Sequence, residues 1–256
     1  MANKYFDITV KSLMKYMGRL INIAKIEQAL KRVIDEDFSD QKLYKLIYYL
    51  KNRGYLHNIK KNVFLVKRPE TEFTQQQLLD LFYRTIVKQH CTEFLKSNRY
   101  IGWLKALELN TSSFAIPDEL LIVNNYKQSN EVIMFTKQIC FKRYGTVKEN
   151  LFSFFYKFAK KITIGKQVYF VADLELALLE SLYNPWLIHT GYVTELVKRI
   201  LRERKDDLDL TVREKILRKN KHHSSINRLY KIAQSVDPVF ADKIKVLIKK
   251  VSYFIG

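Results

Sequence analysis

The sequence predicts an α+β protein with a small first unit and a larger mixed second unit that ends in helices. Gly and Pro number only 7 and 4 among 256 residues, which favours long regular elements joined by short loops. Hydrophobic residues make up 47% of the chain, enough to bury a sizeable core. The spacing of the apolar residues changes along the chain from helical to strand-like and back, which indicates both kinds of element.

The first predicted unit covers residues 1–70 and holds three helices and a hairpin. Apolar residues repeat at helical spacing in three stretches: 10–17, 23–34 and 40–53. Asn22 and Ser39 are placed to cap the second and third helices, and Gly54 to end the third. Two strand-like runs, YLHNI and VFLVKRP, then flank a basic turn. This order is that of a winged helix-turn-helix, with a basic helical subdomain as the alternative.

The second predicted unit covers residues 71–256 and is a mixed α/β domain with a helical C-terminal part. Before the first strands, helices are expected at 75–92 and 99–109. Strands are expected at 120–125, 131–136, 139–144, 161–164 and 167–171, with a helical stretch at 149–160. Asp173 should cap a further helix that Asn184-Pro185 closes. Four helices should follow at 189–205, 211–220, 224–235 and 238–254.

The net charge of +19 points to a polyanionic partner and is concentrated at the two ends of the chain. Residues 1–70 hold 15 basic and 7 acidic residues, residues 71–197 hold 14 and 12, and residues 198–256 hold 16 and 7. Two basic ends could therefore hold a single polyanion. Two cysteines make no disulfide framework, and no apolar run has the length of a signal peptide or a membrane span. We expect a cytoplasmic protein without a membrane partner.

The third helix is the element expected to contact double-stranded DNA, because the second helix of a helix-turn-helix lies in the major groove. With Leu43, Leu46, Ile47 and Leu50 buried, the other side chains point outward. The expected DNA-binding residues on this helix are Gln41, Lys42, Tyr44, Lys45, Tyr48 and Lys51. Those in the wing are Asn58, Lys60, Lys61 and Asn62. A solvated polar face is the alternative, and so is a winged helix that binds protein.

Three segments resemble the AbiEi antitoxins of type IV toxin–antitoxin systems. They are LYKLIYYLKNRGYLHNIKKNVFLVKRP at 43–69, IGWLKALELN at 101–110 and VADLELALLESLY at 171–183. The chain departs from the family in lacking a wing-turn Gly at residues 60–62 and in having Leu104 where Ser is common. The resemblance implies a repressor that binds operator repeats of its own operon and also counters a nucleotidyltransferase toxin. We expect the basic residues Lys198, Arg199, Arg202 and Arg204 to contribute to the antitoxin surface.

No catalytic residue, cofactor or metal is expected. The chain has no Gly-rich phosphate loop and no GxSxG or HExxH motif, and His90-Cys91 and His222-His223 lack partners for a metal site. A nuclease is one alternative, because Pro117-Asp118 could open a metal-dependent motif, although no Glu-x-Lys follows. Glu108, Asp118, Glu119, Asp173 and Glu175 are expected to be caps and surface charges. The other alternative is a plasmid or mobile-element protein that binds DNA in replication or maintenance.

Overall fold

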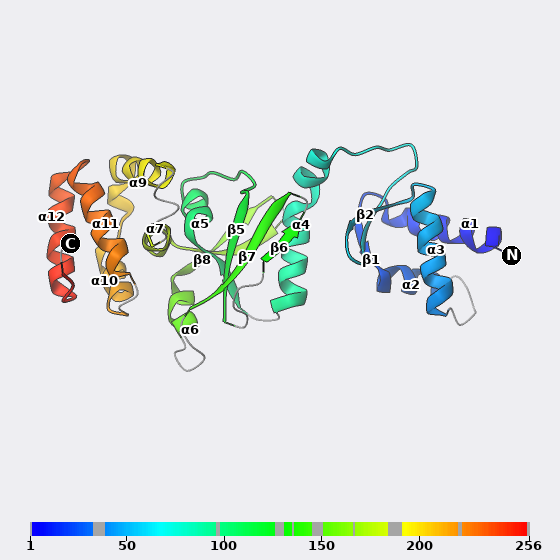
Figure 1. Cartoon of the computed structure of the whole chain (residues 1–256), viewed down its shortest axis with the longest axis horizontal. Helices are drawn as coiled ribbons and strands as arrows, with labels where there is room; N and C mark the ends of the chain where they lie inside the picture. Colours follow the sequence, from blue (N-terminus) through cyan, green and yellow to red (C-terminus); the bar gives the residue numbers. More distant parts are fainter. Residues whose placement is uncertain are drawn as a thin grey trace. The chain divides into compact units, whose positions relative to one another are not determined.

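The chain is α+β, as predicted, and it divides into two compact units, 1–81 and 82–256. The computed structural model, drawn in Figure 1, describes residues 2–32, 39–95, 98–125, 131–134, 136–144, 151–165, 167–183, 191–219 and 222–254, except for the side chains of residues 2–5, 93 and 94. The predicted boundary at residue 70 precedes α4 (Gln75–Leu95), whereas the division between the two units falls within that helix.

The first unit packs helices against a small antiparallel sheet. Its elements are α1 (Ala2–Leu13), η1 (Met14–Tyr16), β1 (Leu20–Asn22), α2 (Ile23–Lys31), α3 (Asp40–Asn52), β2 (Leu56–Lys60) and β3 (Val63–Val66). Among the described residues, the three strands lie in the order β1-β3-β2. The helices therefore precede the hairpin, as predicted, and β1 extends its sheet.

Local capping signals explain where α2 and α3 begin. The Asn22 side chain accepts a hydrogen bond from the Lys25 amide at 2.9 Å, and the Ser39 hydroxyl accepts one from the Lys42 amide at 3.4 Å. Gly54 follows α3 with a φ of +77°, a conformation that other residues adopt at a cost. These three predictions are confirmed. The segment 33–38, which joins α2 to α3 and includes Val33, lies outside the described residues.

Two features of the first unit differ from the prediction. The first helix begins at Ala2 instead of residue 10, and residues 20–22 form a strand. This strand is short and pairs with β3, so that Leu20 lies opposite Leu65. Because its partner is distant in the sequence, no local pattern indicates it.

The second unit is built around a mixed sheet. Its first elements are α4, β4 (Arg99–Ile101), α5 (Trp103–Asn110), β5 (Glu119–Asn124), β6 (Glu131–Met134), β7 (Lys137–Arg143), α6 (Leu151–Phe155), η2 (Tyr156–Phe158), β8 (Ala159–Ile164) and β9 (Gln167–Ala172). In the described part of the chain, six strands lie in the order β6-β7-β5-β4-β9-β8. The pairs β5–β7 and β4–β9 are parallel, and the other pairs are antiparallel.

The predicted helix at 99–109 is wrong at its start. Arg99–Ile101 is a strand in the interior of the sheet, between β5 and β9, and Tyr100 and Ile101 are buried. The helix begins only at Trp103, after Gly102. The predicted helical stretch at 149–160 is also too long, because Ala159 and Lys160 belong to β8. In both places sheet pairing overrides local helical spacing.

Helices complete the second unit. They are α7 (Leu174–Ser181), α9 (Tyr192–Glu203), η3 (Lys205–Asp207), α10 (Leu210–Leu217), α11 (His223–Gln234) and α12 (Pro238–Lys250), close to the predicted positions. The Asp173 side chain accepts a hydrogen bond from the Leu176 amide at 2.8 Å, which confirms the predicted cap. Asn184-Pro185 lies outside the described residues. No described helix is long and apolar enough to cross a membrane.

The helix α7 is buried on all sides, and this overturns the prediction that Glu175 is a surface charge. Glu175 is buried and forms an ion pair of 2.6 Å with Arg213 of α10, whose side chain is fully buried. Its other carboxylate oxygen accepts a hydrogen bond from the Asp209 amide. Burial is the largest influence on the Glu175 carboxyl and raises its pKa, against the opposing effect of Arg213. The pair joins α7 to α10.

Candidate nucleic-acid interface

The outward face of α3 presents polar and aromatic side chains to solvent. Its apolar side packs into the core of the first unit through Leu43, Leu46, Ile47 and Leu50. The remaining side chains are exposed: Gln41, Lys42, Tyr44, Lys45, Tyr48, Tyr49, Lys51 and Asn52. The structure therefore brings together, on one face, all six helix residues that the sequence singled out for DNA contact.

Three tyrosines on this face are unusually exposed for their size. Tyr44, Tyr48 and Tyr49 expose 56%, 59% and 40% of their surface, and the rings of Tyr48 and Tyr49 meet edge to face at 6.0 Å between centroids. Exposed aromatic surface of this extent is typical of a face that is covered by a partner. Their hydroxyls can donate to phosphate oxygens, and their rings can pack against sugars.

The turn that joins β2 to β3 forms a basic tip at one end of these two strands of the sheet. Lys61 and Asn62 lie in the turn, where Asn62 has a φ of +64°. Asn tolerates this conformation better than most residues, so it replaces the glycine that such a turn commonly has. Asn58 and Lys61 are exposed, Lys60 is half-buried, and the pairing shifts register between Asn58 and Lys60. The turn thus offers amide and ammonium donors but no acidic group.

Two other cations near α3 are used within the unit. The Lys67 ammonium donates to the carbonyls of Arg68, Pro69 and Thr71, which holds the segment after β3. The Arg53 guanidinium lies 4.4 Å from the centroid of the Phe6 ring. Partial burial, with a further effect from Lys67, lowers the pKa of His57. The lysines of the α3 face and Lys61 of the hairpin tip are therefore better placed to meet an outside anion.

The basic residues predicted on α9 do not form one uniform surface. Arg199 and Arg202 are exposed. Lys198 donates to Glu195 at 2.7 Å, and Arg204 donates to Asp207 at 2.8 Å and to the Asn110 carbonyl. Arg204 therefore links α9 to the end of α5, and Arg199 and Arg202 are the two of these four that remain for an outside partner.

A buried carboxylate network that sequence reasoning missed lies where α5 meets α7. Glu180 is fully buried, and its carboxylate accepts hydrogen bonds from the Tyr100 hydroxyl at 2.8 Å, the Tyr144 hydroxyl at 2.6 Å and the Trp103 amide at 2.9 Å. Burial raises the pKa of Glu180 to about 7, although the three hydrogen bonds favour the charged form. We call these four residues the Glu180 network.

The backbone at the start of α5 is fitted closely to this network. Trp103 has a φ of +53°, in the left-handed region, which is strained for a bulky residue. Its ring stacks on Tyr144 at 5.7 Å, and the Lys142 ammonium lies 4.4 Å from its centroid. A Cβ on Gly102 would come within 2.7 Å of a Glu180 oxygen, so no other residue fits there without movement. A sequence signal did exist, since Glu180 is one of two acids, with Glu175, in a helix whose other residues are nearly all apolar.

His222, which follows a basic run in the sequence, is also buried. Its ring packs edge-on against Phe155 at 5.7 Å and Tyr183 at 6.2 Å, and neither ring nitrogen has a hydrogen-bond partner in the described part of the chain. Burial lowers its pKa to about 4. The neutral ring therefore behaves as an aromatic core residue.

The described residues include no group of three or more His, Cys, Asp or Glu side chains that could hold a metal ion. Asp118, considered above as part of a nuclease motif, forms an ion pair of 2.5 Å with Lys137 on the neighbouring strand β7. The Glu108 carboxylate accepts hydrogen bonds from the Lys105 ammonium at 2.8 Å and from the Tyr192 hydroxyl at 3.1 Å. These acids are engaged with basic or hydroxyl partners rather than arranged around a common point.

The fold has a counterpart among solved structures. The crystal structure of the RV2827C protein from Mycobacterium tuberculosis matches with a TM-score of 0.60 over 95% of this chain and 81% of that one, at 10% sequence identity. No protein-family model matches the chain. Among curated proteins, no significant match was found. At this identity the likeness concerns the α+β fold alone.

Proposed function

We propose that the chain is a DNA-binding repressor of its own operon and the antitoxin of a type IV toxin–antitoxin system, without catalytic activity of its own. The observation that carries the DNA-binding part is the outward face of α3, where three exposed tyrosines and three lysines lie beside Gln41. The order of helices and hairpin strands fits a winged helix.

The physical fit to DNA follows from this face. A helix inserted in the major groove meets base edges through its N-terminal residues, where Gln41 can bond to adenine through both its amide oxygen and its amide nitrogen. Lys42, Lys45 and Lys51 can neutralise phosphates, and the tip of the β2–β3 hairpin can reach the adjacent backbone through Lys61. Phosphate contacts would fix the position of the helix, and Gln41 would contribute sequence preference.

The antitoxin part rests on the resemblance to the AbiEi antitoxins. The two segments that carry this resemblance in the second unit, 101–110 and 171–183, are packed on each other. The Asn110 side-chain amide donates to the Ala172 carbonyl at 2.8 Å, and the Trp103 amide donates to Glu180. Residues that are similar to the family in two distant stretches thus belong to one packed core, which supports treating them as one antitoxin-like domain.

Footprinting of the full chain on the DNA upstream of its own gene tests the proposal. We expect protection of repeated sequences there. Gln41→Ala should relax the sequence preference at a cost of roughly 1–3 kcal/mol on the best site. Lys61→Ala should weaken binding to all DNA sequences by the same factor. Protection of iterated repeats elsewhere, with none upstream of the gene, would favour the replication or maintenance protein instead.

The antitoxin role requires a nucleotidyltransferase gene beside the gene for this chain, and it is tested separately in cells that express that toxin. We expect the full chain to relieve growth inhibition by that toxin, and Gln41→Ala to relieve it equally while repression is lost. Arg199→Ala with Arg202→Ala should reduce the relief of toxicity, with Lys231→Ala on α11 as the exposed control. Growth inhibition that the chain leaves unchanged would contradict the antitoxin role.

A further inference from the structure

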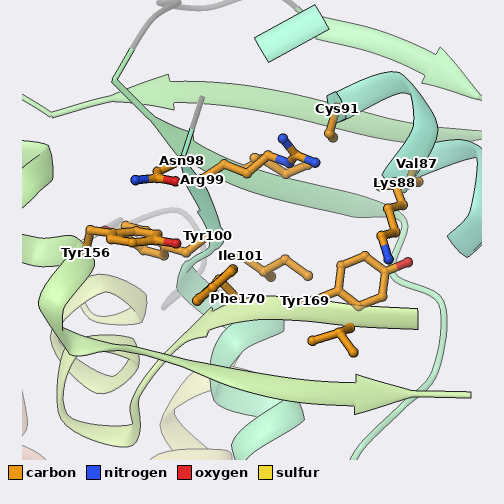
Figure 2. A pocket seen from close by; sticks show the side chains of 12 residues that line it. Val87, Lys88, Cys91, Asn98, Arg99, Tyr100, Ile101, Tyr156, Tyr169 and Phe170 are labelled. Atoms are coloured by element: carbon orange, nitrogen blue, oxygen red, sulfur yellow. The ribbon is translucent and has the colours of Figure 1, made fainter. Parts of the chain in front are cut away.

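A cavity of about 240 Å³ lies on one face of the sheet in the second unit (Figure 2). It lies between α4, the interior strands β4 and β9, and Tyr156 of η2. Its apolar wall is made by Val87, Ile101, Ile122, Val168 and Phe170. None of these residues is among the proposed DNA contacts, because the proposed DNA contacts all lie on α3 and the β2–β3 hairpin.

The charges of this cavity are of one sign. Its described lining includes Lys88 and Arg99 and no acidic residue. Arg99 is held by a hydrogen bond of 2.7 Å from its guanidinium to the Thr92 hydroxyl. Lys88 is half-buried, and its ammonium makes no hydrogen bond or ion pair within the part of the chain that the structure describes. An ammonium that lines a cavity without a counter-charge among the described residues attracts an anion from outside.

Aromatic rings line the rest of the cavity. Tyr156 and Phe170 lie 5.3 Å apart between ring centroids with an angle of 43°. In Figure 2, Lys88 reaches from α4 toward Tyr169 at one end of the cavity, and Tyr156 and Asn98 lie at the other. The Tyr169 hydroxyl is already committed, because it donates to the Arg84 carbonyl at 2.7 Å. The cavity therefore has the Lys88 ammonium at one end and the Tyr156 ring at the other, and Arg99 also belongs to its lining.

We propose that this cavity binds a small planar aromatic anion of one or two rings, with the ring against Tyr156 and Phe170 and the anionic group at Lys88 and Arg99. Its size sets the limit, since a cavity of about 150 Å³ accepts benzene. Val168 lines the cavity and exposes 46% of its surface, so this part of the lining is accessible from solvent. The anionic group is a carboxylate or a phosphate, both of which pair with ammonium and guanidinium groups.

Calorimetric titration of the full chain tests this site. The probes are indole-3-carboxylate and phenyl phosphate. Indole-3-carboxylate is compared with indole, its ring alone, and with acetate, which carries only the anionic group. Phenyl phosphate is compared with phenol and with inorganic phosphate in the same way. We expect at least one of the two aromatic anions to bind at least tenfold more tightly than either of its parts. The tighter of the two identifies the anionic group.

Three variants locate the binding. Lys88→Gln should weaken the affinity for the aromatic anion at least tenfold. Lys160 is an exposed lysine on β8 outside the cavity, and Lys160→Gln should leave the affinity unchanged. Val168→Trp places a larger side chain in the lining and should abolish binding, with an unchanged melting temperature as evidence of folding. Absence of binding by both anions, equal binding of indole and its carboxylate, or binding that survives Lys88→Gln would overturn the proposal.

Discussion

The two units use the same residue types in opposite ways. On α3 the tyrosines and lysines are exposed, and the structure gives the hydroxyls of Tyr44 and Tyr48 no partner in its described part. In the Glu180 network the hydroxyls of Tyr100 and Tyr144 are buried, and both donate hydrogen bonds to the Glu180 carboxylate. Polar groups that satisfy each other stabilise the fold, whereas polar groups left at the surface are available to a partner. This difference locates the candidate interface on α3.

The largest expected effect comes from breaking a buried ion pair. Arg213→Met leaves Glu175 buried without its counter-charge, and we expect the free energy of unfolding to fall by about 3–5 kcal/mol. Lys45→Met, an exposed lysine on α3, should change it by less than about 0.5 kcal/mol. Denaturant unfolding followed by circular dichroism measures both. Equal effects of the two substitutions would remove the contrast between the units.

The next effect separates the two uses of tyrosine. Tyr144→Phe removes a buried hydroxyl from Glu180 and should cost roughly 1–3 kcal/mol of stability, with unchanged affinity for DNA. Tyr48→Phe should leave stability unchanged and weaken DNA binding by roughly fivefold, the equivalent of one hydrogen bond. Unfolding and DNA titration are run on both variants. A stability loss in Tyr48→Phe, or a loss of DNA affinity in Tyr144→Phe, would contradict the division of roles.

The smallest stability effect is a pH dependence that originates in Glu180. Because burial raises the pKa of Glu180 to about 7 from 4.5, the folded state holds a proton that the unfolded state releases, and this stabilisation is lost as the pH rises through 7. Between pH 6 and 8 the loss amounts to roughly 1 kcal/mol. The neutral buried His222, with its pKa lowered to about 4, acts in the opposite direction below pH 6.5.

Comparison with Glu180→Gln isolates the carboxyl. Between pH 6 and pH 8 the wild type should lose roughly 1 kcal/mol of unfolding free energy relative to this variant, because the variant has no carboxyl to titrate at this position. The contribution of His222 is present in both proteins and cancels. A difference that stays constant with pH would mean that Glu180 titrates well below this range.

Elements with local signals could be predicted from the sequence. Asn22, Ser39 and Asp173 each cap a helix through a contact three residues away, and the apolar stripe of α3 sets its buried side. The outward residues of α3 follow from the same spacing. The candidate interface is therefore accessible to sequence reasoning, because a single helix with a regular apolar stripe carries most of it.

The features that escaped prediction depend on contacts between distant residues. The strand β4 has three residues, and its Ile101 pairs with Val171. The burial of Glu180 follows from hydroxyls supplied by Tyr100 and Tyr144, which lie 80 and 36 residues away. A short strand and a buried acid have no periodicity of their own. The sequence pattern therefore predicts a helix at the strand. An acid within a largely apolar helix suggests burial of Glu180, but it does not indicate which distant hydroxyls surround the carboxylate.

The measurement that tests the central claim most directly is the affinity of the full chain for duplex DNA as a function of salt. If the lysines of the α3 face and the hairpin tip, together with other basic residues of the chain, neutralise about five to eight phosphates, the log–log slope should be about −4 to −7. Lys42→Gln with Lys45→Gln should make the slope shallower by about 2, because two phosphate contacts are lost. A flat dependence in the wild type, or an unchanged slope in the double variant, would contradict the assignment of this face to DNA.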